Sequence, residues 1–90
     1  MLDYVQSLHK DNSVPTLIRF PTCKIEVRPR DHRPPHVHVL FADGREALVD
    51  LASGQVTSRR KIRATELAEA LAWIDAHAEE LIARFEELQR

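Results

Sequence analysis

The chain is poor in several residue types, and each shortage narrows the kind of protein it encodes. Its single cysteine, Cys23, cannot form an internal disulfide, which favours a reducing compartment such as the cytoplasm. No apolar run approaches the ~20 residues that a membrane-spanning helix needs. The first residues also lack the basic start and apolar stretch of a secretory signal. With two glycines, the chain has no glycine-rich phosphate loop, and it has no Cys-x-x-Cys pair. We therefore expect a small cytoplasmic domain.

Charge is distributed unevenly along the 90 residues. Residues 14–63 carry ten Lys/Arg against five Asp/Glu, whereas residues 64–90 carry two against seven. A basic half is typical of proteins that bind phosphate backbones or acidic partners. The alternative is that an acidic helix simply lies beside a basic sheet. The asymmetry permits RNA as a partner without establishing it.

The first two thirds of the chain predict an antiparallel sheet. Alternating or β-rich segments occur at residues 16–20, 24–28, 36–41 and 46–51, with a short fifth candidate at 55–58. The Asp43-Gly44 pair is typical of a tight hairpin turn. Because every connection is short, the strands should pair as a meander. Residues 1–14 are an N-terminal extension with a short helix expected over 2–10, and residues 15–90 form one domain.

The last third predicts helix. An Ala/Leu/Glu-rich stretch follows Thr65, the expected N-cap, and its apolar residues keep a 4-3-4-3 spacing through Leu67, Leu71, Ile74, Ala78, Leu81, Phe85 and Leu88. An unbroken helix would be ~37 Å long, so a break near residues 75–77 is one alternative. These apolar residues form a continuous seam along the helix. The seam either packs on the sheet or forms an interface with a second copy, as a homodimer, or with a partner helix. The expected fold class is α+β, with a four- to five-stranded antiparallel meander and a C-terminal helical layer on one face.

Three of the five histidines lie within seven residues, in the segment Asp31-His32-Arg33-Pro34-Pro35-His36-Val37-His38. Histidine gains or loses a proton, or binds a metal, near neutral pH. The two prolines restrict the backbone around it. Strand alternation predicts that His36 and His38 project from one face, while Val37, Val39 and Phe41 take the opposite, helix-covered face.

Three interpretations of this segment stay open. In the first, His32, His36 and His38, together with Asp31, form a set that binds a divalent metal such as zinc. In the second, these histidines act as acid and base on a phosphodiester, with Asp31 orienting an imidazole. The substrate phosphate would then be bound by Arg28, Arg30 and Arg33. In the third, the aspartate caps a turn and the histidines line a solvated face or an interface.

Two further features are candidates for accessory roles. Trp73 and His77 are four residues apart on one helix face, where His77 could complete the histidine site or both could be packing residues. The basic run Arg59-Arg60-Lys61-Arg63 precedes the helix. This basic run either contacts phosphate or is a solvated linker.

These residues together resemble a small bacterial family, domain-of-unknown-function family 4160. The resemblance covers roughly residues 15–88. It rests on Pro15-Thr16 with Arg19-Phe20, on Asp31-His32 with Pro34-Pro35-His36 and His38, on Glu46-Ala47-Leu48 with Gly54, and on Trp73, His77, Glu80 and Leu81. Two departures are the extension at residues 1–14 and Phe85, where the family often has a second tryptophan.

The resemblance implies a function that the residues alone do not. Such genes often lie beside a partner of domain-of-unknown-function family 2442, in pairs that resemble type II toxin–antitoxin modules. By that resemblance the chain is the toxin-like member, with Asp31, His32, His36 and His38 as its candidate active site. The resemblance attaches no reaction to these residues; action on RNA is our expectation from the basic segment and the histidine cluster. The alternatives are a non-catalytic antitoxin or adaptor that binds a protein partner, and a small metal-binding domain.

Overall fold

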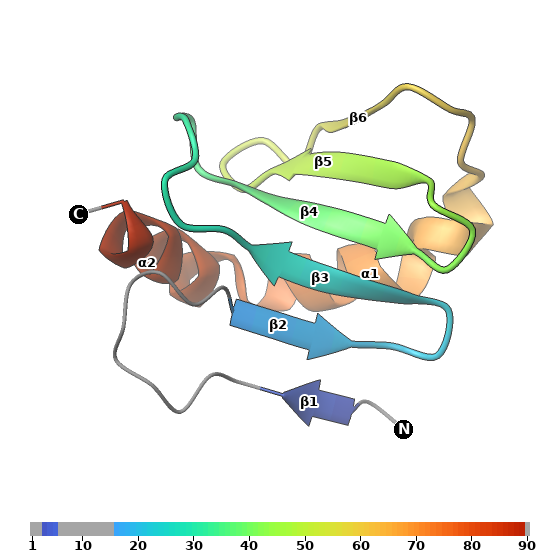
Figure 1. Ribbon diagram of the computed structural model, residues 1–90, viewed down its shortest axis with the longest axis horizontal. Helices are drawn as coiled ribbons and strands as arrows, with labels where there is room; N and C mark the ends of the chain where they lie inside the picture. Colours follow the sequence, from blue (N-terminus) through green and yellow to red (C-terminus); the bar gives the residue numbers. More distant parts are fainter. Residues whose placement is uncertain (1–2, 6–15, 90) are drawn as a thin grey trace.

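The protein is described from a computed structural model, which covers residues 3–5 and 16–89. Within these residues one sheet has six strands in the order β1 to β6, and all neighbours are antiparallel (Figure 1). The strands are β1 (Asp3–Val5), β2 (Thr16–Arg19), β3 (Cys23–Val27), β4 (His36–Phe41), β5 (Glu46–Asp50) and β6 (Val56–Ser58). The helices are α1 (Ala64–Ala76) and α2 (Ala78–Leu88).

The α+β fold and the meander are confirmed, and the five expected strands correspond to β2–β6. The helix expected over residues 2–10 is wrong at residues 3–5, which form β1 and pair with β2. A sheet edge presents unpaired backbone donors and acceptors, and an extended neighbouring segment satisfies them. The rest of the expected helix lies outside the described residues.

The helical layer covers one face of the sheet (Figure 1). It consists of two helices, because the chain leaves the helical conformation at His77, whose backbone dihedrals are φ −118° and ψ 19°. The His77 N–H still donates to the carbonyl oxygens of Trp73 and Ile74. Since the apolar seam continues across the break, both helices pack on the sheet. The alternative of a break near residues 75–77 is thus the correct one.

The core lies between the sheet and the two helices. The inward positions of alternating strand residues are buried, as expected for Ile25 and Val27. The fully buried residues from both layers include Ile18, Ile25, Val27, Val37, Val39, Val49, Phe85 and Leu88. Phe85 is the largest of them. The valines of β4 therefore face the helices, and the intervening histidines face the other side.

Helix α1 begins two residues before the expected position, at an ion-pair network. Arg63, not Thr65, is the N-cap, and its N–H donates to the Glu66 carboxylate at 3.0 Å. The other partner of that carboxylate is Arg45, which binds it through Nη1 and Nη2 at 3.1 and 2.5 Å. The Glu66 side chain, at the third helical position, reaches back to the Arg63 N–H. The Thr65 hydroxyl does not take this role, because Thr65 already lies within the helix.

We expect Glu66→Gln to reduce the loss of stability in acid. The hydrogen bond from Arg45, together with the one from Arg63, lowers the pKa of Glu66 from 4.5 to about 2. A carboxyl whose pKa is lower in the folded state stabilises the fold above its unfolded pKa, and this contribution disappears as the pH falls toward the folded pKa. Melting temperatures measured between pH 4.5 and 2 should therefore fall less steeply in the variant. Glu69→Gln, an exposed change on the same helix, is the control; equal slopes in Glu66→Gln and wild type contradict the expectation.

Candidate functional site

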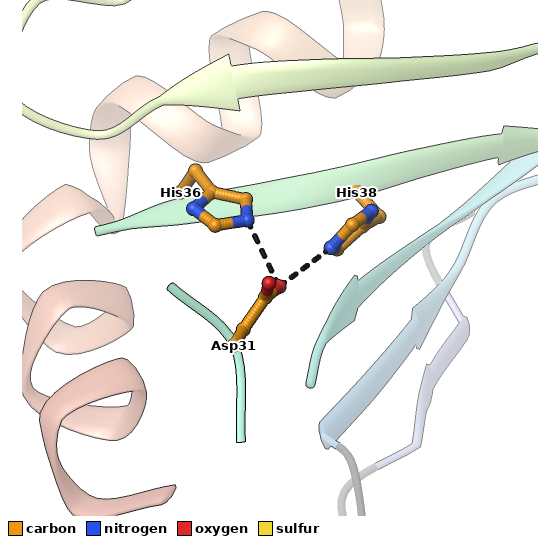
Figure 2. Close-up of side chains that lie close together, drawn as sticks. All are labelled: Asp31, His36 and His38. Atoms are coloured by element: carbon orange, nitrogen blue, oxygen red, sulfur yellow. Dashed lines mark hydrogen bonds and ion pairs between the residues drawn. The ribbon is translucent and has the colours of Figure 1, made fainter. Parts of the chain in front are cut away.

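Asp31, His36 and His38 meet beside the first half of β4, where strand alternation directs the two histidines away from Val37 and Val39. His36 and His38 lie on β4 opposite Asp50 and Leu48 of β5, so they share one face as the alternation predicts. Asp31 comes from the loop between β3 and β4 and lies between the two rings (Figure 2). Its Oδ2 is 2.9 Å from His36 Nε2 and 2.8 Å from His38 Nε2. Both histidines are only 6% exposed, so the cluster is enclosed rather than solvated.

The opposite nitrogen of each imidazole is held by an acceptor. His36 Nδ1 donates to the carbonyl oxygen of Pro34 at 2.8 Å, and His38 Nδ1 donates to the Glu46 carboxylate at 2.6 Å. A hydrogen bond of this kind determines which ring nitrogen carries the proton. In the neutral form, both histidines therefore direct an Nε2 lone pair at the Asp31 carboxylate.

The two Nε2 atoms beside Asp31 are not both satisfied by hydrogen bonds from the described residues. His38 Nε2 can donate to Asp31 only when its ring carries a second proton, since its Nδ1 is already a donor. His36 Nε2 lies near the same oxygen but is buried and has no hydrogen-bond partner among the described residues. Burial raises the pKa of Asp31, but the His38 hydrogen bond and the charge of His36 outweigh it and lower that pKa. The carboxylate thus stays ionised beside two ring nitrogens.

These three residues have the composition of a metal-binding group. Among the described residues, they form a set whose potential ligand atoms all lie within 4.8 Å of one another. Two imidazole nitrogens and a carboxylate suit zinc and related divalent metals. The Nδ1 contacts to Pro34 and Glu46 correspond to the outer partners that orient histidine ligands in metal proteins.

The end of α2 positions the loop that carries Asp31. The backbone N–H of Asp31 donates to Gln89 Oε1 at 2.5 Å, and Gln89 Nε2 donates to the Arg28 carbonyl oxygen at 3.0 Å. The guanidinium of Arg33 also pairs with the Glu86 carboxylate. Arg30, just before Asp31, has a φ of 53°, which a non-glycine residue adopts only when its surroundings enforce it. The loop is therefore fixed by contacts with a distant segment.

Glu46 and Gln89 contact the cluster but were not among the site residues predicted from the sequence. Glu46 lies on β5, eight residues from His38, and its side chain points to the histidine face by strand alternation. That alternation was a usable signal for Glu46. Gln89 lies 58 residues from Asp31, and no local pattern connects the two.

The remaining predicted site residues lie around the cluster without joining it. The His32 side chain is 79% exposed, and its Nδ1 is 3.3 Å from the other oxygen of Asp31. Its ring is 5.2 Å from that of His36. Arg28 pairs with Glu26 and, at 3.5 Å, with Glu46. Arg30 is exposed. Phosphate binding by Arg28, Arg30 and Arg33 thus stays a prediction, and two of these arginines have internal carboxylate partners.

Trp73 and His77 form a separate aromatic contact at the helix break. Their rings are stacked with centroids 4.1 Å apart, and His77 Nδ1 donates to the Trp73 carbonyl oxygen at 2.8 Å. Trp73 also contacts Phe20 edge-on at 6.3 Å. His77 is therefore not brought into the Asp31–His36–His38 cluster. Cys23 is buried, and burial raises the pKa of its thiol.

No helix among the described residues has the length and apolar character to cross a membrane.

Comparisons with known proteins identify the family of this chain. Searches of curated proteins and of solved structures each returned no match. A family comparison matches residues 24–86, more than half of the chain, and this region contains the whole cluster. The chain belongs to the family described as a domain of unknown function, DUF4160.

Proposed function

We propose that this chain is a metal-binding, toxin-like protein whose functional centre is a divalent cation held by Asp31, His36 and His38. The observation that carries the proposal is the convergence of two Nε2 atoms on one carboxylate oxygen while both Nδ1 atoms are engaged as donors. When both rings are neutral, three lone-pair-bearing atoms are directed at one point and repel one another, and either protonation of a ring or a metal cation relieves this repulsion. A metal ion satisfies all three, including the buried Nε2 of His36.

A metal centre fits the cluster better than acid–base catalysis by the histidines alone. A general acid and base must reach the substrate through their ring nitrogens. Here both Nδ1 atoms are bound to protein groups, and both Nε2 atoms face Asp31. The present separations of 2.8 and 2.9 Å are shorter than the ~3.3 Å between ligands in a tetrahedral site with bonds of about 2.0–2.1 Å. Binding therefore requires the donors to move apart by roughly 0.5 Å.

The number of protein ligands indicates what kind of metal site this is. Structural zinc sites usually have four protein ligands, whereas catalytic sites have three and an open position. The cluster supplies three, so zinc bound there would polarise a substrate oxygen and activate water for hydrolysis. Asp31, His36 and His38 would hold the ion, while the Pro34 carbonyl and Glu46 fix the two rings. His32, with a side chain that is 79% exposed, lies beside Asp31 at the solvent side of the cluster.

Hydrolytic chemistry is compatible with a toxin-like component of a type II toxin–antitoxin pair acting on RNA. Support for that finer assignment comes from the family resemblance and from the basic segment at residues 14–63. On this proposal the acidic helices would bind the protein partner of the family 2442 type. A metal site without growth inhibition favours instead the small metal-binding domain, and a cluster that binds no metal favours the antitoxin or adaptor.

The proposal is tested by titrating the metal-free chain with zinc in a calorimeter. We expect one ion per chain for the wild type, and a loss of affinity of more than 100-fold for His38→Asn, since even outer-shell changes cost 10–100-fold. His77→Asn is the matched control, because this histidine lies outside the cluster. Equal affinities in His38→Asn and His77→Asn overturn the metal site.

Expression of the same three proteins in a bacterial host gives the second readout. Wild type and His77→Asn should arrest growth, and His38→Asn should not, provided that soluble levels are equal. Growth arrest by all three proteins would show that toxicity does not depend on the cluster, even if the cluster binds zinc.

A further inference from the structure

A cavity opens beside the cluster on the same face of the sheet. It has a volume of about 460 Å³, and its lining includes His38, Leu48, Thr57, Ser58, Arg59 and Arg60. A second cavity of about 230 Å³ is lined by His36 together with the same Leu48 and Thr57. The two cavities are therefore neighbours, with one histidine of the cluster in each. Volumes of this order are typical of small-molecule sites.

Some charged side chains around the larger cavity have ion-pair or hydrogen-bond partners among the described residues, and others do not. Arg45 binds the carboxylates of Asp43 and Glu66, and Glu46 accepts from His38. By contrast, Arg59 and Arg60 form no salt bridge with any residue that the structure describes, although Arg60 is near enough to Asp43 to lower the pKa of that carboxyl. The two arginines thus present guanidinium donors at the wall of the cavity.

The chemistry of this wall indicates the class of ligand. Guanidinium groups bind phosphate oxygens through paired, charge-assisted hydrogen bonds. The hydroxyl of Thr57 adds a neutral donor, and Leu48 supplies an apolar surface. The carboxylate in the lining, Glu46, accepts a hydrogen bond from His38 and lies 3.5 Å from Arg28, so it is engaged with protein groups. The cavity therefore suits an anion that also has an apolar part.

We propose that this cavity binds the phosphate group of a phosphate-ester substrate through Arg59 and Arg60, and so places the ester beside the metal site. The inference rests on the proposed function, because it names the substrate class of that centre. It assigns phosphate binding to the segment after β6, whereas Arg28 and Arg33 of the histidine loop are occupied by internal carboxylates. A phosphodiester of RNA and a small phosphate monoester share this chemistry, and the experiment separates them.

The test measures ligand binding to the full zinc-loaded chain. A short fluorescent 2′-O-methyl oligoribonucleotide, which keeps the phosphodiesters and resists cleavage, is titrated by anisotropy. Inorganic phosphate is titrated in parallel by calorimetry. For Arg59→Ala/Arg60→Ala we expect at least a tenfold loss of affinity, given the strength of charge-assisted hydrogen bonds. The dependence of log affinity on log salt should fall by about 1.4 for the oligonucleotide, or ~0.7 per phosphate contact.

Arg84→Ala, a change on helix α2, is the control and should bind both ligands like the wild type. Loss of both ligands, or of the oligonucleotide alone, in the double variant supports a phosphodiester substrate. Loss of inorganic phosphate alone supports a small monoester. Unchanged affinity for both ligands overturns the inference. Zinc affinity of the double variant, measured separately, should equal that of the wild type. A chain that binds phosphate through the arginines but no zinc disproves the metal centre and leaves the phosphate site.

Discussion

Saturating zinc is expected to raise the melting temperature of the metal-free chain by about 10–20 °C. A ligand that binds only the folded state adds about 2.7 kcal/mol of stability at one hundred times its dissociation constant. In a domain of 60–100 residues, 1 kcal/mol corresponds to about 4–8 °C. The large effect follows from the position of the ligands, since Asp31 lies on a loop and His36 and His38 on a strand. The ion would add a direct link between the loop and the strand to the hydrogen bonds and ion pairs that join them.

Asp31→Asn is expected to remove most of this zinc-dependent shift. The amide keeps the size of the side chain but loses the negative charge that zinc would bind. Asp75→Asn, an exposed change at the end of α1, is the matched control and should respond to zinc like the wild type. The melting temperatures are measured with chelator and with zinc for all three proteins. A shift of equal size in Asp31→Asn shows that any zinc bound to the chain is held elsewhere.

Phe85→Ala is expected to lower the free energy of unfolding by about 3–5 kcal/mol. Phe85 is 0% exposed and is the largest fully buried side chain. The substitution leaves a cavity between α2 and the sheet, and a loss of this size is a large part of the 5–15 kcal/mol that stabilises most domains. Urea denaturation monitored by circular dichroism measures it, because the midpoint shift at constant slope reports stability.

The same substitution should also weaken the candidate site. The Phe85 ring lies 5.4 Å from that of His36, so the aromatic side chain supports the imidazole from the helix side. Phe85→Leu keeps most of the apolar volume and is expected to lose less stability than Phe85→Ala. Zinc affinity should decrease from the wild type to Phe85→Leu and further to Phe85→Ala. A Phe85→Ala protein that loses under 1 kcal/mol contradicts the assigned core position.

The fold could be predicted largely because its signals are local. Alternation in residues 24–28 and 36–41 identifies two neighbouring strands and the face on which each side chain lies. The apolar seam of the last third likewise predicts which helix face is buried. The strand at residues 3–5 was not predictable in this way, because its conformation follows from pairing with β2 rather than from its own sequence.

The candidate site was predictable only in part. The sequence places Asp31 and His32 beside His36 and His38 as candidate ligands, but only Asp31 of these two joins the cluster. Which of the two adjacent side chains points inward depends on the backbone of the loop, and that backbone is fixed by Gln89 and Glu86. Contacts over such a separation leave no periodic pattern in a single sequence.

The contact between Gln89 and Asp31 also has a consequence for the order of events on the ribosome. Synthesis proceeds from the N-terminus, so all three cluster residues emerge some 50 residues before the helix end that holds their loop. The nascent sheet can pair while Asp31 is still untethered. The cluster is completed only when residues 86–89 have been made and have docked, so the assembly of the site waits for a segment that is synthesised some 50 residues after its ligands.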